Sequence, residues 1–197
     1  MIRRGEPWGL ETTWPEDAVI IHSDHALALA DPSRPVFLAS GDISRSLGHP
    51  SMPSGDGKCT EVRIDAMLCT VASSAGERKI VAASSIIVGS HWRHRHMIIS
   101  NGGWWNEWNI APRAHPNDGI VELLTLSEKM TMRQRWLAKR KMRTGTHLPH
   151  PDISMVRISS ATVDRISGEK LLIDGQAVSI WESLSVEVLP DYWRVLV

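Results

Sequence analysis

Three tryptophans and one aspartate between residues 100 and 126 form the densest group of chemically useful side chains in the sequence. Trp104, Trp105 and Trp108 offer ring faces, and Asp118 offers a carboxylate, in a stretch whose glycines and prolines favour a loop. Ring faces beside a carboxylate can bind a ligand. Large rings also pack readily in a core, so a tryptophan-rich sheet core with a tight turn is the competing interpretation.

Two other groups have the residue types of a binding site but not its surroundings. His94 and His96 alternate onto one face of an expected strand, yet two imidazoles without a nearby carboxylate or cysteine make a poor zinc site. Residues 54–58, Ser-Gly-Asp-Gly-Lys, look like a phosphate-binding loop, but an alternating strand follows them instead of the helix that such a loop needs. We interpret residues 54–58 as an exposed turn.

Two extended segments converge on the tryptophan-bearing loop and must position it. Asn101-Gly102-Gly103 supplies a bend after a strand that ends near Ile99. Asn117-Asp118-Gly119 supplies a turn before a second strand from Ile120 to Leu126. We therefore expect strands to fix both ends of the loop.

The residues before position 60 predict less regular structure than those after it. Residues 1–17 lack periodicity and favour an irregular arm, residues 18–39 favour two short strands around a short helix, and residues 41–48 favour a helix that ends at a glycine. We expect residues 1–59 to form an N-terminal arm and a vestigial α/β segment.

The second part of the chain, residues 60–197, is dominated by strand patterns. The stretches from Ile80 to Val88 and from Met155 to Val163 each favour one strand, and Asp174-Gly175 between apolar residues is a strong hairpin signal. The predicted class is mainly β, most economically a two-layer antiparallel β-sandwich with one basic helix and a small α/β N-terminal remnant.

The segment from Ser127 to Arg143 is the one convincing helix. Met132 and Trp136 give it an apolar stripe at i, i+4 spacing. Its cations, which no acidic residue after Glu128 accompanies, are Arg133, Arg135, Lys139, Arg140, Lys141 and Arg143. A surface helix with its stripe on the sheet and a helix that places residues 128–143 on a lipid or anionic membrane surface both fit this pattern.

Composition limits the other classes of function. The 22 basic and 22 acidic residues balance, so the chain as a whole has no reason to bind nucleic acid. Cys59 and Cys69 are the only cysteines, which favours free thiols in the cytoplasm. No apolar run reaches membrane-spanning length, so we expect a soluble protein. The sequence is compatible with a homo-oligomer and with a hetero-oligomer.

Four separated motifs agree in order with a known family. Asn101-Gly102-Gly103, residues 111–114, residues 117–122 and residues 173–176 follow one another as in the C-terminal half of the bacterial diacylglycerol kinase and lipid kinase family, which resembles NAD kinase in fold. The family's pattern there is Asn-Gly, Gly-Gly, Pro-x-Ala, Asp-Gly-x-Leu-Asp and Asp-Gly-Glu. Residues 41–48 resemble its Asn-Asp-Phe-Ala-Arg-x-Leu-Gly helix. The resemblance thus extends to both parts of the chain.

The resemblance implies roles for four residues. Asp174 and position 176 would belong to the catalytic Asp-Gly-Glu motif, whose glutamate takes the proton from the lipid hydroxyl. Position 176 is Gln176 here, and an amide cannot accept that proton at neutral pH. Asp118, with the carbonyl of Ile120, would help to hold a structural magnesium ion. The alternative for Asp118 is a carboxylate that bonds its own turn.

The resemblance does not extend to the family's ATP-binding half. Too few residues lie upstream for the family's Gly-Gly-Asp-Gly-Thr loop, and residues 38–41, Leu-Ala-Ser-Gly, stand where Gly-Thr-Gly-Asn is expected. We therefore do not expect this chain to bind ATP.

We expect a non-catalytic relative of the lipid kinases, a pseudoenzyme that binds a lipid headgroup, a small ligand or a partner chain. The candidate ligand-binding residues are Asn101, Gly102, Gly103, Trp104 and Trp105. The alternatives are an active lipid kinase, working alone or with an ATP-binding partner, and a structural interaction module. An open apolar hollow at the tryptophans would favour a binder, and rings that fill the space would favour a structural module.

Overall fold

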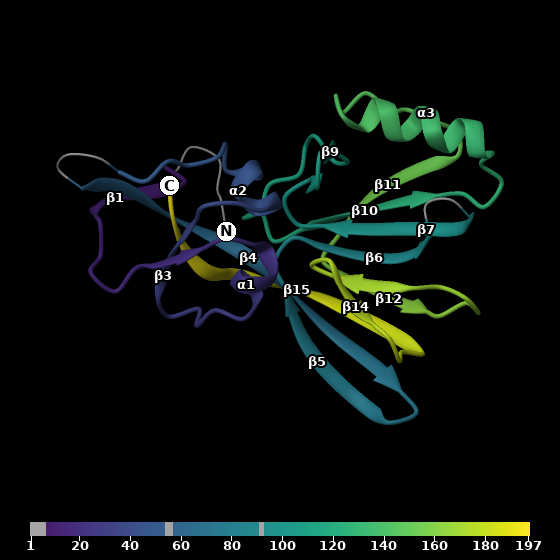
Figure 1. Ribbon diagram of the computed structural model, residues 1–197, viewed down its shortest axis with the longest axis horizontal. Helices are drawn as coiled ribbons and strands as arrows, with labels where there is room; N and C mark the ends of the chain where they lie inside the picture. Colours follow the sequence, from purple (N-terminus) through teal and green to yellow (C-terminus); the bar gives the residue numbers. More distant parts are fainter. Residues whose placement is uncertain (1–6, 54–56, 91–92) are drawn as a thin grey trace.

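The computed structural model describes residues 7–53, 57–90 and 93–197 (Figure 1). Most of the expected turn at residues 54–58 and the side chain of His94 lie outside the described residues. Within these ranges the chain forms three helices and fifteen strands. The mainly β class is confirmed.

Two long strands, β4 and β15, run antiparallel through the larger sheet. They pair from Glu61 opposite Leu196 to Ala72 opposite Ser183, with an irregularity between Leu189 and Trp193. β5 and β12 join one end of this pair, and β1, β3 and β2 join the other end. The strands are β1 (Gly9–Thr13), β2 (Val19–Ile21), β3 (Pro35–Leu38), β4 (Lys58–Ser73), β5 (Gly76–Ala82), β12 (Ser160–Asp164) and β15 (Ser183–Leu196).

The smaller sheet is antiparallel, in the order β11-β10-β7-β6-β13-β14. Its strands are β6 (Ser85–Ser90), β7 (Arg93–Ser100), β10 (Val121–Leu126), β11 (Ile153–Ile158), β13 (Leu171–Ile173) and β14 (Gln176–Val178). A separate ribbon of β8 (Trp104–Trp105) and β9 (Trp108–Asn109) lies in the loop between β7 and β10. Because Ser100 of β7 pairs opposite Glu122 of β10, adjacent strands of one sheet hold both ends of this loop, as expected.

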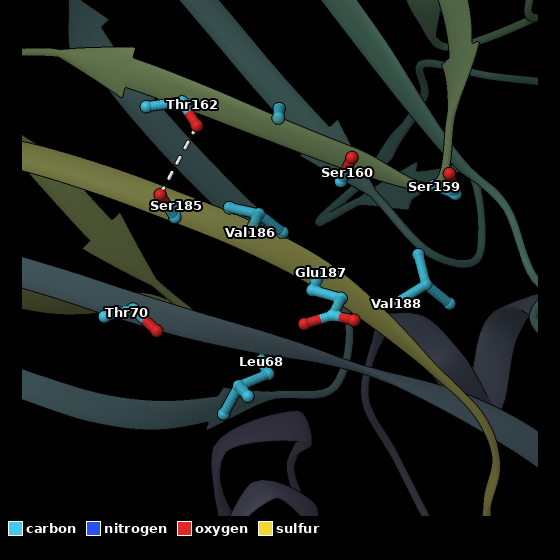
Figure 2. Close-up of a pocket in the computed structure, with 10 residues that line it drawn as sticks. Leu68, Thr70, Ser159, Ser160, Thr162, Ser185, Val186, Glu187 and Val188 are labelled. Atoms are coloured by element: carbon cyan, nitrogen blue, oxygen red, sulfur yellow. Dashed lines mark hydrogen bonds between the residues drawn. The ribbon is translucent and has the colours of Figure 1, made fainter.

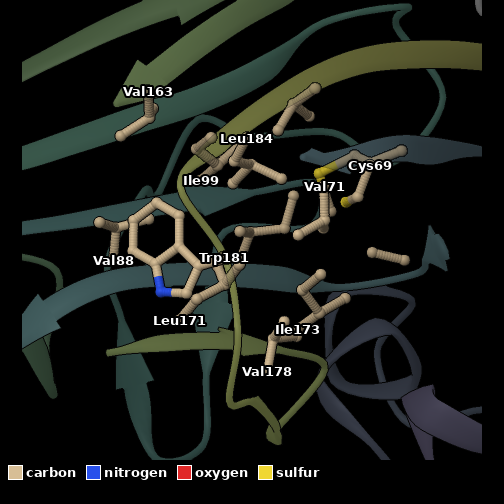
Figure 3. Close-up of a cluster of buried hydrophobic side chains, with 14 of the residues drawn as sticks. Cys69, Val71, Val88, Ile99, Val163, Leu171, Ile173, Val178, Trp181 and Leu184 are labelled. Atoms are coloured by element: carbon tan, nitrogen blue, oxygen red, sulfur yellow. The ribbon is translucent and has the colours of Figure 1, made fainter. Parts of the chain in front are cut away.

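The main core lies between the two sheets (Figure 3). Cys69 of β4 and Leu184 of β15 meet Ile99 of β7 and Leu171 of β13, and Trp181 lies fully buried among them. Burial of a large apolar side chain stabilises the fold by roughly 1.5–3 kcal/mol. Inward-facing residues of both sheets thus form one core, which confirms the two-layer packing.

A second core lies beneath the N-terminal α/β segment. β2 and β3 are parallel, and α1 (Asp24–Ala28) and α2 (Asp42–Ser46) follow them in turn. Leu27 of α1 and Ile43 of α2 are fully buried in a cluster that includes Trp193 of β15. The N-terminal α/β elements therefore extend the larger sheet.

The third helix, α3 (Met132–Met142), covers the outer face of the smaller sheet (Figure 1). Ala138 and Met142 pack there against Ile98 and Leu124. Thr131 and Gln134 form a capping box, so the helix begins five residues later than the expected Ser127. None of the described helices has the length and apolar character needed to cross a membrane.

Three expectations about strands are wrong, and in each case a contact with a distant part of the chain is the reason. Residues 9–13 are not irregular, because β1 pairs with β4. The expected strand from Ile80 to Val88 breaks at Ala83 and Ser84, whose N–H groups bond Asp174. The expected strand from Met155 to Val163 divides at Ser159, where the chain passes from the smaller sheet to the larger one.

Candidate functional site

Asn101, expected among the ligand-binding residues, is fully buried and bonds the backbone. Its Nδ2 donates to the carbonyl oxygens of Asp65 at 2.8 Å and Ala83 at 3.0 Å, and its N–H donates to the carbonyl oxygen of Ser84 at 2.9 Å. These bonds connect the end of β7 to β4 and to the corner before β6. Asn101 therefore holds the two sheets together.

Gly102 and Gly103 are required by close contacts with the surrounding chain. Ser46 Oγ, at the end of α2, donates to the carbonyl oxygen of Gly102 at 2.7 Å, and a Cβ at Gly102 would lie 2.2 Å from that Oγ. Gly103 has φ +80°, and a Cβ there would lie 2.3 Å from the carbonyl oxygen of Ala111. Protein atoms thus occupy the space beside both glycines.

The half-buried rings of Trp104 and Trp105 pack against different parts of the protein. The guanidinium carbon of Arg45 lies 5.0 Å from the Trp104 ring centroid, and the Trp105 and Trp108 centroids are 5.0 Å apart. Trp105 borders a hollow of about 20 Å³ beneath α3, which is large enough for about one water molecule. Little space is therefore left beside Trp105 beneath α3, which agrees with a structural role for this ring.

Asp174 and Gln176 lie together at the β13–β14 hairpin, as the Asp-Gly pair predicts, but Asp174 is occupied by the fold. Its carboxylate accepts hydrogen bonds from the N–H groups of Ala83 at 2.6 Å, Ser84 at 2.9 Å and Ser85 at 3.0 Å, and from Ser84 Oγ at 3.1 Å. Gln176 is exposed at the first position of β14. Asp174 thus ties the hairpin to the β5–β6 corner.

Two carboxylates that the sequence analysis did not single out interact with Asp174. Asp24 accepts hydrogen bonds from the N–H groups of Asp42 at 2.7 Å and Ile43 at 3.0 Å, at the start of α2. Burial raises the pKa of Asp24 to about 6, those hydrogen bonds oppose the rise, and the charges of Asp42 and Asp174 add to it. The sequence signal was only an acidic residue in the first turn of a short helix. Among the described residues, no group of three or more His, Cys, Asp or Glu could hold a metal ion.

Asp65 is a third carboxylate without a functional signal in the sequence. It alternates with apolar residues in β4, yet it is fully buried. Its Oδ1 accepts a hydrogen bond from the N–H of Asp191 at 2.8 Å, and its Oδ2 accepts one from the N–H of Gly119 at 2.7 Å. Burial raises its pKa. Asp65 fixes the Asp118-Gly119 turn to the larger sheet.

Asp118 and Ile120, the proposed magnesium ligands, lie in a turn whose carboxylate already pairs with Arg157 of β11. Asp118 Oδ1 accepts a hydrogen bond from the N–H of Ile120 at 3.2 Å, which closes the turn, and Oδ2 accepts one from Arg157. Arg157 Nε also lies 3.7 Å from Glu122 Oε1. Burial, followed by the charge of Asp118, raises the pKa of Glu122 to about 7, and Arg157 opposes this rise. A magnesium ion bound to Asp118 Oδ2 would have to displace the guanidinium.

The outward face of α3 combines apolar side chains with cations. Met132, Trp136, Lys139, Arg140 and Arg143 follow i, i+4, i+7, i+8 and i+11 spacing, which places them on one face. We call these five residues the α3 stripe. Its Met132 and Trp136 are 53% and 51% exposed, whereas Ala138 and Met142 on the opposite face are buried.

The C-terminal half of the α3 stripe borders a hollow of about 280 Å³, which Trp108 of β9 closes on the other side. Lys139 Nζ lies 4.3 Å from the Trp108 ring centroid, and the guanidinium carbon of Arg140 lies 5.4 Å from the Trp136 centroid. Arg143 Nη2 pairs with Glu107 Oε1 at 2.9 Å. We call this space the α3 hollow. Sequence analysis found its helix but not Trp108 as its opposite wall, because that contact depends on the packing of the β8–β9 ribbon.

A larger open hollow of about 460 Å³ lies elsewhere, on strands β4, β12 and β15 (Figure 2). Thr70, Thr162, Ser185 and Glu187 contribute polar groups to it, and the hydroxyls of Thr162 and Ser185 are 3.3 Å apart. None of the candidate site residues from the sequence lines this hollow. It has the hydroxyl-rich lining of an ordinary solvated sheet surface.

Comparison with known proteins bears on the fold. No protein-family model matches the sequence, and a search of curated proteins gave no match. A solved structure from Bacillus anthracis str. Sterne, assigned as a diacylglycerol kinase, has a TM-score of 0.55 and 12% identity, covering 91% of this chain and 77% of that chain. A second structure of the same description has a TM-score of 0.53 with the same identity and coverage.

A yeast NADH kinase solved in complex with NADH is also similar. Its TM-score is 0.52 at 9% identity, and the match covers 91% of this chain and 60% of that chain. Identities this low show the fold alone. This chain therefore has the fold shared by diacylglycerol kinases and NADH kinase.

Proposed function

We propose that this chain is a lipid-kinase-like protein that transfers no phosphate and binds an anionic lipid surface through α3. The observation that carries the proposal is the α3 stripe, in which exposed Met132 and Trp136 stand beside Lys139, Arg140 and Arg143. An interfacial helix needs this combination, because apolar groups enter the lipid while cations contact its headgroups. The opposite face of the helix packs on the smaller sheet, so the fold does not need the α3 stripe for packing.

The state of the Asp174–Gln176 hairpin supports the non-catalytic part of the proposal. Gln176 has no proton-accepting group at neutral pH, and the carboxylate of Asp174 already accepts four hydrogen bonds from the β5–β6 corner. Free cysteines Cys59 and Cys69 agree with a cytoplasmic location, where membrane leaflets carry anionic lipid.

One observation favours an active lipid kinase as the second candidate. Burial raises the pKa of Asp24 and of Asp42, and the charge of Asp174 adds to both shifts. Perturbed carboxylates of this kind also occur at active sites. Such an enzyme would act alone or with an ATP-binding partner, and phosphate transfer from radiolabelled ATP to diacylglycerol distinguishes it from a silent relative.

The direct test is co-sedimentation with vesicles that contain phosphatidylserine. We expect the chain to sediment with them at low salt and to be released as ionic strength rises, because each well-placed cation contributes on the order of 1 kcal/mol. Arg140→Gln with Arg143→Gln should weaken sedimentation, and Trp136→Ala should weaken it at every salt concentration at which the wild-type chain still sediments. Absence of the wild-type chain from the pellet at low salt would reject the proposal.

A further inference from the structure

The α3 hollow has a definite charge balance. Lys139, Arg140 and Arg143 contribute three positive charges, and Glu107, which pairs with Arg143, contributes one negative charge. These four residues together carry a net charge of +2. An anion of two charges would neutralise it.

The walls and size of the hollow restrict the anion further. Indole rings of Trp108 and Trp136 form part of its lining, and its volume of about 280 Å³ is at the lower end of the range for small-ligand sites. A phosphomonoester carries −1.5 to −2 near neutral pH and presents several strong acceptor oxygens. Arginine forks match those oxygens in geometry and charge. A headgroup fits this volume, whereas a whole lipid does not.

The position of the hollow on α3 indicates how a bound lipid would be oriented. Trp136 belongs both to the hollow and to the exposed apolar end of the α3 stripe, which Met132 continues one turn toward the N-terminus. A headgroup in the hollow would thus have apolar surface directly beside it. Acyl chains that leave the headgroup can pass Trp136 and Met132 into the bilayer.

We propose that the α3 hollow recognises the phosphomonoester headgroup of a lipid, and that Lys139, Arg140 and Arg143 bind its phosphate oxygens. The inference rests on the proposed function, because it presumes that α3 meets an anionic lipid surface. It adds that α3 recognises the chemical group at the lipid surface and not only the density of negative charge there.

The test compares vesicles of matched surface charge that contain either phosphatidic acid, a phosphomonoester, or phosphatidylserine, a phosphodiester. We expect the wild-type chain to bind the phosphatidic acid vesicles about tenfold more tightly, the gain of one or two charge-assisted hydrogen bonds. Arg140→Gln with Arg143→Gln should abolish that preference. The matched control, Arg133→Gln with Lys141→Gln, removes the same charge from exposed positions of the helix outside the hollow and should weaken both kinds of binding equally.

Each other result has one meaning. Equal binding of the wild-type chain to both vesicle types overturns the headgroup inference and leaves the proposed function standing, whereas no binding to either overturns the proposed function itself. A preference that survives in the Arg140→Gln, Arg143→Gln variant also overturns the inference. Inorganic phosphate is the soluble probe: if it displaces the chain from both vesicle types equally at millimolar concentration, the hollow is a site for free phosphate and the lipid assignment fails.

Discussion

The loop at residues 100–119 and the α3 stripe both carry tryptophans beside polar or charged groups, but they use them differently. In the loop, Asn101 bonds three backbone carbonyl groups through its side chain and N–H, and α2 occupies the space beside Gly102. On α3, Trp136 and Met132 are about half exposed, at 51% and 53%, and Arg140 stacks on a ring. The loop motif agrees with a known family, yet the stripe is the more accessible surface.

The difference shows that the residues of a family motif can make contacts that hold the fold together and need not bind a ligand. A buried amide that satisfies backbone carbonyls cannot turn to a ligand without leaving those carbonyls unpaired. Among the described residues, the exposed cations and rings of the α3 stripe do not pair with buried backbone carbonyls. Substitutions in the loop should therefore change stability, and substitutions in the stripe should change binding with little effect on stability.

The largest expected effect is that of Asn101→Ala. The substitution leaves the carbonyl oxygens of Asp65 and Ala83 buried without the amide, and we expect the free energy of unfolding to fall by about 3 kcal/mol. Urea denaturation measures this change. Gln176→Ala, at an exposed amide, is the matched control and should stay within about 0.5 kcal/mol of wild type. A loss below about 1 kcal/mol for Asn101→Ala would contradict the structural role of the loop.

The same denaturation experiment sharpens the comparison when it is applied to α3. Arg140→Gln with Arg143→Gln removes two exposed cations and should leave the free energy of unfolding within about 0.5 kcal/mol of wild type. If this variant were as destabilised as Asn101→Ala, the stripe would be part of the fold and not a surface for binding.

A smaller effect is expected at Glu122, and it depends on pH. Burial raises the pKa of Glu122 from 4.5 to about 7, so the folded protein holds a proton that the unfolded chain releases. This group's contribution to the free energy of unfolding therefore falls as pH rises from about 4.5 to about 7 and is level above that. Glu122→Gln should be more stable than wild type at pH 8 by on the order of 2 kcal/mol and similar to it at pH 4.

Chemical denaturation of both proteins across this pH range provides the measurement. Glu107→Gln, which changes an exposed carboxylate near α3, serves as the control and should run parallel to wild type. Parallel curves for Glu122→Gln and wild type would show that Glu122 does not titrate in this window.

The predicted magnesium site at Asp118 can be tested by substituting Arg157, the residue that pairs with its carboxylate. Arg157 is 57% exposed on its side chain, so loss of its ion pair should cost less than about 1 kcal/mol. Removing a competing cation should, however, favour a divalent ion on the same oxygens. In calorimetric titrations with magnesium, we expect Arg157→Gln to bind more tightly than wild type, and Asp118→Asn to bind less tightly. Equal heats from all three proteins would remove the site.

Local signals were sufficient for much of the fold. Asp174-Gly175 predicted the β13–β14 hairpin, and the glycine that ends residues 41–48 agrees with the position of α2. Local signals failed where a distant residue decides. Ala83 and Ser84 leave the strand because Asp174, about ninety positions later, accepts their N–H groups, and the strand after Met155 divides because its two halves pair with different sheets.

The candidate site follows the same rule. Helical spacing places Lys139, Arg140 and Arg143 on one face of α3, whereas Arg135, which the sequence also counts among the cations of this helix, is buried. Trp108 as a wall of the hollow and Asp65 as the anchor of Gly119 depend on contacts between separate strands and loops, which spacing does not encode. The sequence can therefore name a charged helix face, but it cannot determine which buried carboxylates serve the fold.

The smallest expected effect is that of Gln176→Glu on phosphate transfer, where we expect none. The substitution restores a proton acceptor, and the loss of a general base alone costs about 10²- to 10⁴-fold in rate. Catalysis of phosphoryl transfer depends mainly on positioning and charge stabilisation of the phosphates, which one carboxylate does not supply. We would measure transfer from radiolabelled ATP to diacylglycerol and sphingoid lipids by wild type, Gln176→Glu and Asp174→Asn. Turnover by wild type that disappears in Asp174→Asn, in protein shown to be folded, would establish an active kinase. Activity only in Gln176→Glu would mean that this chain binds and positions ATP after all.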